Sequence, residues 1–199
     1  MPGRARQPSY AALLEVMRAV LALLAFILVF FALNVDRLVT IAWWKRRRIE
    51  AIAYRQAGSA VIGRRLGMMC SGASIEPDSR GHCIVTDPNL IQYQWVLRGK
   101  FRDPSSVFNG SILTYMAGPE AEREFGFTPG EDVKDREEIA SMLQWLPKSD
   151  VGHEQQLRKK ACGLVRRHKA KIDLVAKELS KRRKLLADEI DALLASFQH

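Results

Sequence analysis

Near its start the chain carries an apolar run long enough to span a membrane. Residues 19–35 are 17 consecutive residues without a charge. A helix needs roughly 17–25 apolar residues to cross the hydrocarbon core of a bilayer. A second apolar stretch at 38–44 ends in Trp43 and Trp44, and tryptophan is typical of the membrane–water interface. Because no clean small-residue cleavage site follows the run, it predicts a membrane anchor rather than a signal peptide.

Basic residues on both sides of this anchor predict its orientation. Arg37 and the block at 45–48 lie on the C-terminal side, whereas Arg4, Arg6 and Arg18 lie on the N-terminal side. The excess on the C-terminal side favours a cytoplasmic location for the main domain. Three cysteines without a CxxC pair also fit a reducing compartment. We therefore expect a single-pass protein of the inner or cytoplasmic membrane.

The pattern after the anchor predicts mainly helices. Apolar residues recur at helical spacing in residues 48–66, 104–125, 132–146 and, as two or three helices, 152–196. Two strand-like segments, 71–75 and 82–86, flank a Pro-Asp-Ser-Arg-Gly sequence that is typical of a hairpin turn. Residues 87–103 have weaker periodicity and carry no prediction. We expect a mainly α fold with a small β-sheet or hairpin, organised as an anchor at 1–47 and a domain at 48–199.

Five short segments follow one another in a specific order. They read AYRQAGSA at 53–60, ASIEP at 73–77, MAGPEAEREFG at 116–126, GED at 130–132 with Ile139-Ala140 downstream, and LLADEI at 185–190. In this order they resemble AYHEAGHA, VSIxP, GGRAAE with FG, ND with IA, and LxxxEI in the zinc peptidase domain of FtsH-type membrane AAA proteases. The resemblance implies an FtsH-peptidase-like helical domain behind one transmembrane helix.

Four positions carry the chemistry in the family that the chain resembles. In its HExxH helix the two histidines, four residues apart, reach one zinc ion, and the glutamate activates the zinc-bound water. Arg55, Gln56 and Ser59 stand at these positions, and Asp132 matches the third ligand. A guanidinium donates no lone pair, an amide is no base near neutral pH, and a serine is too short to replace an imidazole. The resemblance thus implies a pseudopeptidase with no catalytic residues, no metal and no cofactor.

Two interpretations of Arg55 stay open. It is either a surface residue of an amphipathic helix or a buried cation that replaces the charge of the metal and pairs with Asp132. Glu120, Glu122 and Glu124 are spaced by two, and we expect them to be solvated or to form local ion pairs.

The charge of the chain adds a candidate surface. The formal net charge is +9, and residues 158–184 contain 12 Lys and Arg. This basic tail is either a solvated helical face or a contact for anionic lipid headgroups. The lipid contact would use Arg158, Lys159, Lys160, Lys181, Arg182, Arg183 and Lys184. Without a helix-turn-helix motif or an aromatic platform, nucleic acid is the less favoured anion.

The function we expect is that of a catalytically silent, membrane-anchored binding or regulatory module, with an active FtsH-type protease as its partner. The chain has no P-loop sequence and is not expected to be an ATPase. Two alternatives remain. One is an active metallopeptidase with an unusual ligand set around Asp132, Cys70 or His82; separately, Cys70, His82 and Cys83 are candidate zinc ligands whose spacing matches no standard pattern. The other is binding of anionic lipid or nucleic acid through the basic tail.

Overall fold

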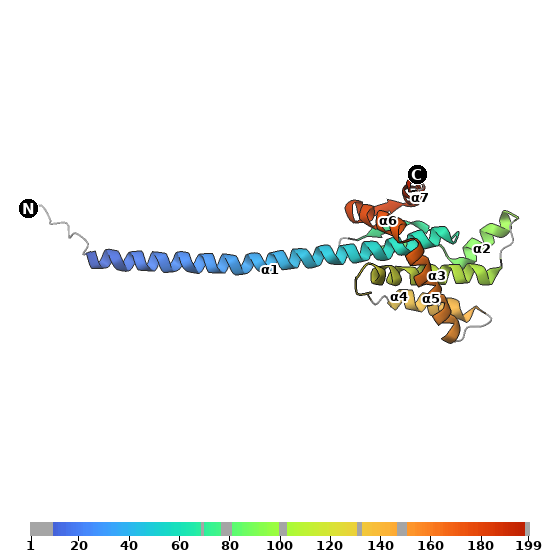
Figure 1. Ribbon diagram of the computed structural model, residues 1–199, viewed down its shortest axis with the longest axis horizontal. Helices are drawn as coiled ribbons and strands as arrows, with labels where there is room; N and C mark the ends of the chain where they lie inside the picture. The colour runs from blue at the N-terminus through green and yellow to red at the C-terminus, as the bar shows by residue number, and fades with distance from the viewer. Residues whose placement is uncertain are drawn as a thin grey trace, which may run out of the picture. The chain divides into compact units, whose positions relative to one another are not determined.

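A computed structural model of the chain describes residues 10–68, 70–76, 81–99, 103–130, 133–146 and 151–197. The chain divides into two compact units, Met1–Arg46 and Arg47–His199. The described residues are mainly helical, with one three-stranded antiparallel sheet (Figure 1). The predicted mainly α fold with a small sheet is therefore confirmed.

The first unit consists of the N-terminal part of α1 (Tyr10–Arg65), a helix of 56 residues. Its segment Leu13–Phe31 has 19 residues, and its length and apolar composition are sufficient to cross a membrane. Residues 10–57 contain neither glycine nor proline, the two residue types that most weaken a helix interior. The predicted anchor and the helix predicted at 48–66 are accordingly parts of one helix.

The second unit is built around residues 47–65 of α1. In Figure 1, α3 (Pro104–Glu124), α4 (Val133–Gln144) and α5 (Val151–Arg167) lie on one side of this segment. The sheet, α6 (Lys169–Arg182) and α7 (Ala187–Ser196) lie on the other side. One core cluster joins α1, α3, α6, α7 and the sheet, and a second joins α3, α4 and α5.

Small residues bring α1 and α3 into close contact. A Cβ atom added at Gly58 would lie 2.6 Å from Ala121 Cβ and 2.8 Å from the carbonyl oxygen of Ala117. One added at Gly118 would lie 2.9 Å from Ser59 Oγ and 3.0 Å from Arg55 Cγ. Neither site has room for a larger side chain, so the turn of α1 that carries Arg55 and Ser59 lies directly against α3.

The sheet has the order β2-β1-β3, with β1 (Cys70–Ile75) in the centre, β2 (Gly81–Val85) on one edge and β3 (Lys184–Leu186) on the other. Both neighbours of β1 are antiparallel to it. The two strands of the predicted hairpin are confirmed, and its turn at 77–80 lies outside the described residues. We expected only helices in 152–196, because the three residues of β3 are too few to show an alternating pattern.

The helix boundaries follow local capping chemistry. Asp103 accepts a hydrogen bond from the backbone N–H of Ser105 at the start of α3, and Pro104 occupies a first-turn position that needs no donor. Asp87 caps α2 (Pro88–Leu97) in the same way, within the region that carried no prediction. The helices predicted at 104–125 and 132–146 correspond to α3 and α4, and the predicted tail helices are α5, α6 and α7.

Candidate functional site

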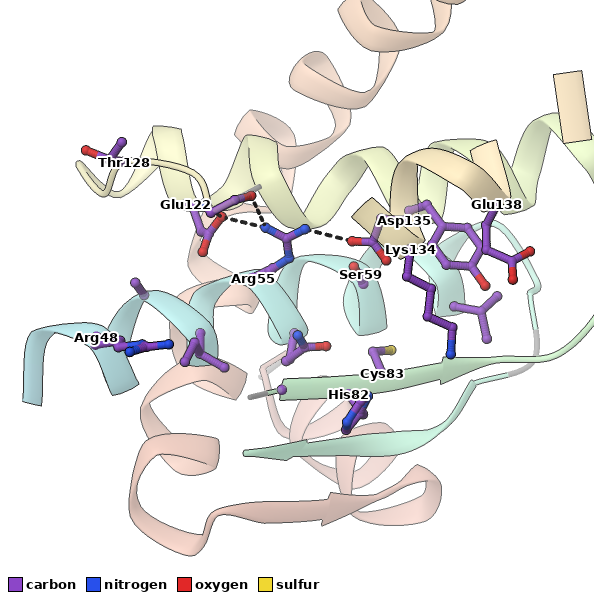
Figure 2. A pocket seen from close by; sticks show the side chains of 17 residues that line it. Arg48, Arg55, Ser59, His82, Cys83, Glu122, Thr128, Lys134, Asp135 and Glu138 are labelled. Carbon is purple, nitrogen blue, oxygen red and sulfur yellow. Dashed lines mark hydrogen bonds and ion pairs between the residues drawn. The ribbon is translucent and has the colours of Figure 1, made fainter. Parts of the chain in front are cut away.

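A pocket of about 650 Å³ opens in the second unit, between α1, β2, the end of α3 and α4 (Figure 2). Arg55, Gln56 and Ser59 all line it. They belong to adjacent turns of one helix, and residues at i and i+4 share a helix face. Three of the four residues singled out from the sequence thus meet at one cavity. The fourth, Asp132, lies outside the described residues.

Arg55 is a buried cation held from three directions. Its Nη1 lies 3.1 Å from Glu122 Oε2 and donates to the Gly130 carbonyl at 2.9 Å, while its Nη2 lies 2.7 Å from Asp135 Oδ2. Only 8% of the residue is exposed. Figure 2 shows the guanidinium between the carboxylates of α3 and α4. The interpretation of Arg55 as a surface residue is therefore wrong.

Glu122 is the most deeply buried of the charged residues in this site, with 3% of its surface exposed. It also accepts a hydrogen bond from the Gly130 N–H at 3.2 Å. Burial raises the pKa of Glu122 above its ordinary value, and Arg55 and the Gly130 N–H oppose that rise.

Our expectation that Glu120, Glu122 and Glu124 are solvated or locally paired is wrong for Glu122, whose partner lies 67 residues away. Glu124 also has distant partners, because it pairs with Arg166 and Lys169, 42 and 45 residues along the chain.

The sequence contains one signal for this partner that we missed. Glu122 follows Gly118 by four residues, so both lie on the face of α3 that contacts α1. A carboxylate one turn from a glycine at a close helix crossing is placed to meet a side chain of the opposite helix. Asp135, the second partner, has no comparable signal, because its position depends on how α4 packs.

Gln56 and Ser59 complete the α1 wall of the pocket. A Cβ added at Gly81 would lie 2.7 Å from Gln56 Nε2, so the amide packs directly over the start of β2. The site therefore presents a permanent cation, an amide and a hydroxyl where the resembled family has two imidazoles and a carboxylate. Among the residues that the structure describes, no three His, Cys, Asp or Glu side chains gather in a way that could hold a metal ion.

The alternative zinc ligands are only partly brought together. The Sγ atoms of Cys70 and Cys83 lie 3.0 Å apart, across β1 and β2. His82 is exposed and points to the opposite side of β2 from Cys83, as neighbouring strand residues do (Figure 2). The two thiols meet each other, and the imidazole does not join them.

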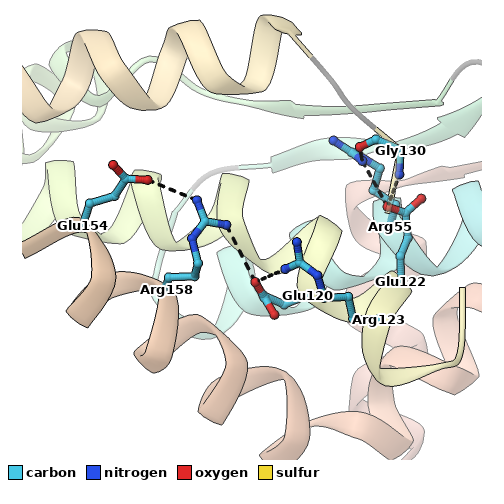
Figure 3. A network of polar contacts seen from close by, with 7 residues as sticks. All are labelled: Arg55, Glu120, Glu122, Arg123, Gly130, Glu154 and Arg158. Atoms are coloured by element: carbon cyan, nitrogen blue, oxygen red, sulfur yellow. Dashed lines mark hydrogen bonds and ion pairs between the residues drawn. The ribbon is translucent and has the colours of Figure 1, made fainter. Parts of the chain in front are cut away.

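A second charged cluster lies where α3 meets α5 (Figure 3). Glu120 forms a close ion pair with Arg123, and Nη1 of Arg158 approaches it to 3.8 Å. Arg158 also pairs with Glu154 at 3.1 Å. The local ion pair that we expected for Glu120 is confirmed by its contact with Arg123. Glu120 is nevertheless buried, with only 8% of its surface exposed.

The basic tail is exposed along α5, α6 and β3, and several of its charges are paired. Lys181 lies 3.7 Å from Glu178, and Arg182 forms a close pair with Glu189. Lys159, Lys160, Arg183 and Lys184 are exposed to solvent. Both interpretations of the basic tail, a solvated helical face and a contact for anionic lipid headgroups, therefore stay predictions.

A comparison of the chain with protein-family models gives no match, and neither does a search of curated proteins.

Proposed function

We propose that this chain is a membrane-anchored pseudopeptidase, a degenerate relative of the zinc peptidase domain of FtsH-type proteases, that acts as a binding or regulatory module. The environment of Arg55 carries this proposal. Its guanidinium stands at the position that the resemblance assigns to the first histidine of HExxH, and it is bound by carboxylates from α3 and α4. A buried cation surrounded by carboxylates is the arrangement we expect where an arginine replaces a metal.

The substitution keeps a positive charge at this position and loses the chemistry of the metal. Peptide hydrolysis at a zinc site needs a Lewis acid with an open coordination position and a base that accepts a proton from the bound water. The guanidinium of Arg55 has no coordination position, and the amide of Gln56 does not accept a proton near neutral pH. What the cation still does is join α1 to α3 and α4, because it contacts Glu122 and Asp135 together.

The anchor limits where such a module acts. The segment Leu13–Phe31 can hold the chain in a membrane, and the basic block at 45–48 favours a cytoplasmic position for the second unit. Confinement to one membrane raises the effective concentration of two proteins for each other. We therefore propose an FtsH-type protease of the same membrane as the partner, contacted through the surface that peptidase domains share.

Affinity capture from membranes tests this partner. The full-length chain, tagged at its C-terminus, is captured in mild detergent, and the eluate is searched for a full-length FtsH-type AAA protease. The control joins residues 1–47 to an unrelated soluble domain, so that it keeps the anchor alone. We expect the protease with the full chain and not with the control. Its absence from the full-chain eluate, or equal recovery with both proteins, would contradict the proposed partnership.

A further inference from the structure

A β-bulge brings Cys70 next to Cys83, which lies in the wall of the pocket. The register of β1 against β2 shifts between Cys70, which lies opposite Val85, and Ala73, which lies opposite Cys83. Two residues of β1 thus face one residue of β2, and Gly72, with φ of 145°, lies within the bulge. In a regular strand, residues three apart such as Cys70 and Ala73 would lie on opposite faces, and the bulge places both on the face of Cys83.

The two thiols differ in access. Cys70 is 3% exposed and belongs to the main core cluster, whereas Cys83 is half-buried and lines the pocket. Their Sγ atoms are 3.0 Å apart, and a disulfide bond is about 2.0 Å long. A shift of about 1 Å in two side chains would bring them to bonding distance. Cys83 is the thiol that a small solute in the pocket can reach, and Cys70 is the thiol behind it.

The contact also shifts the pKa values of the two thiols in opposite directions. The hydrogen bond with Cys83 lowers the pKa of Cys70 to about 7, with a further lowering from Arg64 that burial opposes. The same hydrogen bond, together with burial, raises the pKa of Cys83 well above its ordinary value. The lowered pKa favours the thiolate form of Cys70, which is the form that attacks sulfur during disulfide formation.

We propose that Cys70 and Cys83 are a redox-active pair that closes to a disulfide when hydrogen peroxide enters the pocket. The Cys83 sulfur attacks peroxide while its proton passes to the Cys70 thiolate 3.0 Å away, which gives a Cys83 sulfenic acid and a hydroxide that takes this proton and leaves as water. The Cys70 thiolate then attacks the Cys83 sulfur, the S–S bond forms, the S–O bond breaks, and the hydroxide takes a proton to become a second water. Two thiols and one peroxide give one disulfide and two waters, and a dithiol reductant reverses the step.

Closure would act on the pocket itself. The bond would join the edge strand β2 to the central strand β1 and withdraw the Cys83 thiol from the pocket wall. The bridge would not depend on any partner of the chain, so its test is separate from that of the proposed function.

Mass spectrometry of the full chain in detergent tests the pair. The reduced protein is exposed to hydrogen peroxide, the peroxide is removed, and the remaining thiols are blocked with N-ethylmaleimide. Of the three free cysteines, we expect only Cys162 to be blocked. The mass of the protein, apart from the blocking group, should fall by two hydrogens, and a peptide that links Cys70 to Cys83 should appear after digestion. Dithiothreitol should restore three blocked cysteines.

The third cysteine supplies the matched control. Cys162→Ser removes a half-buried thiol on α5 and should leave the linked peptide unchanged. Cys83→Ser should abolish it and leave Cys70 free for blocking. A wild-type protein that still binds three blocking groups after peroxide treatment would overturn the proposal. So would a disulfide that involves Cys162 in place of Cys70 or Cys83.

Discussion

Two glutamates of α3, separated by one residue, lie in contrasting electrostatic settings. Glu120 and Glu122 are both buried, at 8% and 3% exposure. The side chain of Arg55, which pairs with Glu122, is only 9% exposed, whereas those of Arg123 and Arg158, near Glu120, are 49% and 45% exposed. Figure 3 shows both clusters, the first between α1 and the end of α3, the second between α3 and α5.

The two clusters differ in how far the arginine side chains are exposed to water. A half-exposed guanidinium is screened by water, and water can take its place when it is removed. A buried guanidinium has no such substitute, so its loss leaves an uncompensated charge in a medium of low dielectric. The Arg55 cluster should therefore be essential to the folded state, and the Glu120 cluster should be largely replaceable.

Arg55→Leu should have the largest effect. Removing the guanidinium leaves Glu122 buried without its main counter-charge, and we expect the free energy of unfolding to fall by on the order of 3–5 kcal/mol. The measurement is a urea titration of the full chain in detergent, followed by circular dichroism. The matched control is Arg48→Leu, an exposed arginine of the same helix and pocket, with an expected change within about 0.5 kcal/mol. Equal changes for the two variants would contradict the comparison.

The destabilisation by Arg55→Leu should depend on pH. The pKa of Glu122 is already raised in the folded state, and loss of Arg55 removes an influence that lowers it. A raised folded pKa favours folding while the group is protonated, and that benefit is lost as pH rises through the folded value. The deficit of Arg55→Leu should thus be smaller near pH 4.3, about the ordinary pKa of a glutamate, than near pH 8. Adding Glu122→Gln should remove this dependence; a deficit equally large at both pH values would exclude the mechanism.

Arg123→Ala should cost only about 0.2–1 kcal/mol in the same titration, because water and Arg158 remain near Glu120. The double variant Arg123→Ala with Arg158→Ala should cost more than the sum of the single variants. We expect a coupling of roughly 0.5–3 kcal/mol, since both cations near the buried Glu120 are then gone. Strict additivity would show that the two arginines do not share Glu120.

Glu154→Ala should have the smallest effect. Its pair with Arg158 joins adjacent turns of α5, and both side chains are more than 40% exposed. Pairs of this kind contribute about 0.3–0.5 kcal/mol and are screened by salt. The difference from wild type should disappear in about 1 M NaCl. A deficit that persists in high salt would mean that Glu154 acts through packing rather than charge.

Local patterns predict much of this molecule. The spacing of apolar residues, Pro104 at the start and Gly126 directly after the C-cap residue define α3 closely, and helical periodicity alone places Arg55 and Ser59 on one face. The apolar run near the start predicts the segment that can cross a membrane. In each case the determining residues lie within a few turns of one another.

The features that sequence reasoning missed depend on contacts between distant segments. Glu122 and Asp135 reach Arg55 from 67 and 80 residues away. The short strand β3 exists because β1 offers it a free edge, and Cys70 meets Cys83 because a bulge shifts the register. Neither the sign of a charge nor the period of a helix indicates which distant residue will be the partner. These pairings therefore follow only from the packed fold.

The metal content and peptidase activity of the purified full chain test the central claim most directly. The protein is prepared in detergent without chelators, zinc is quantified by elemental analysis, and the same sample is incubated with casein. From our proposal that Arg55 takes the place of the metal, we predict no stoichiometric zinc and no casein hydrolysis above that of a mock purification. One zinc per chain, together with hydrolysis that a chelator abolishes, would contradict the account.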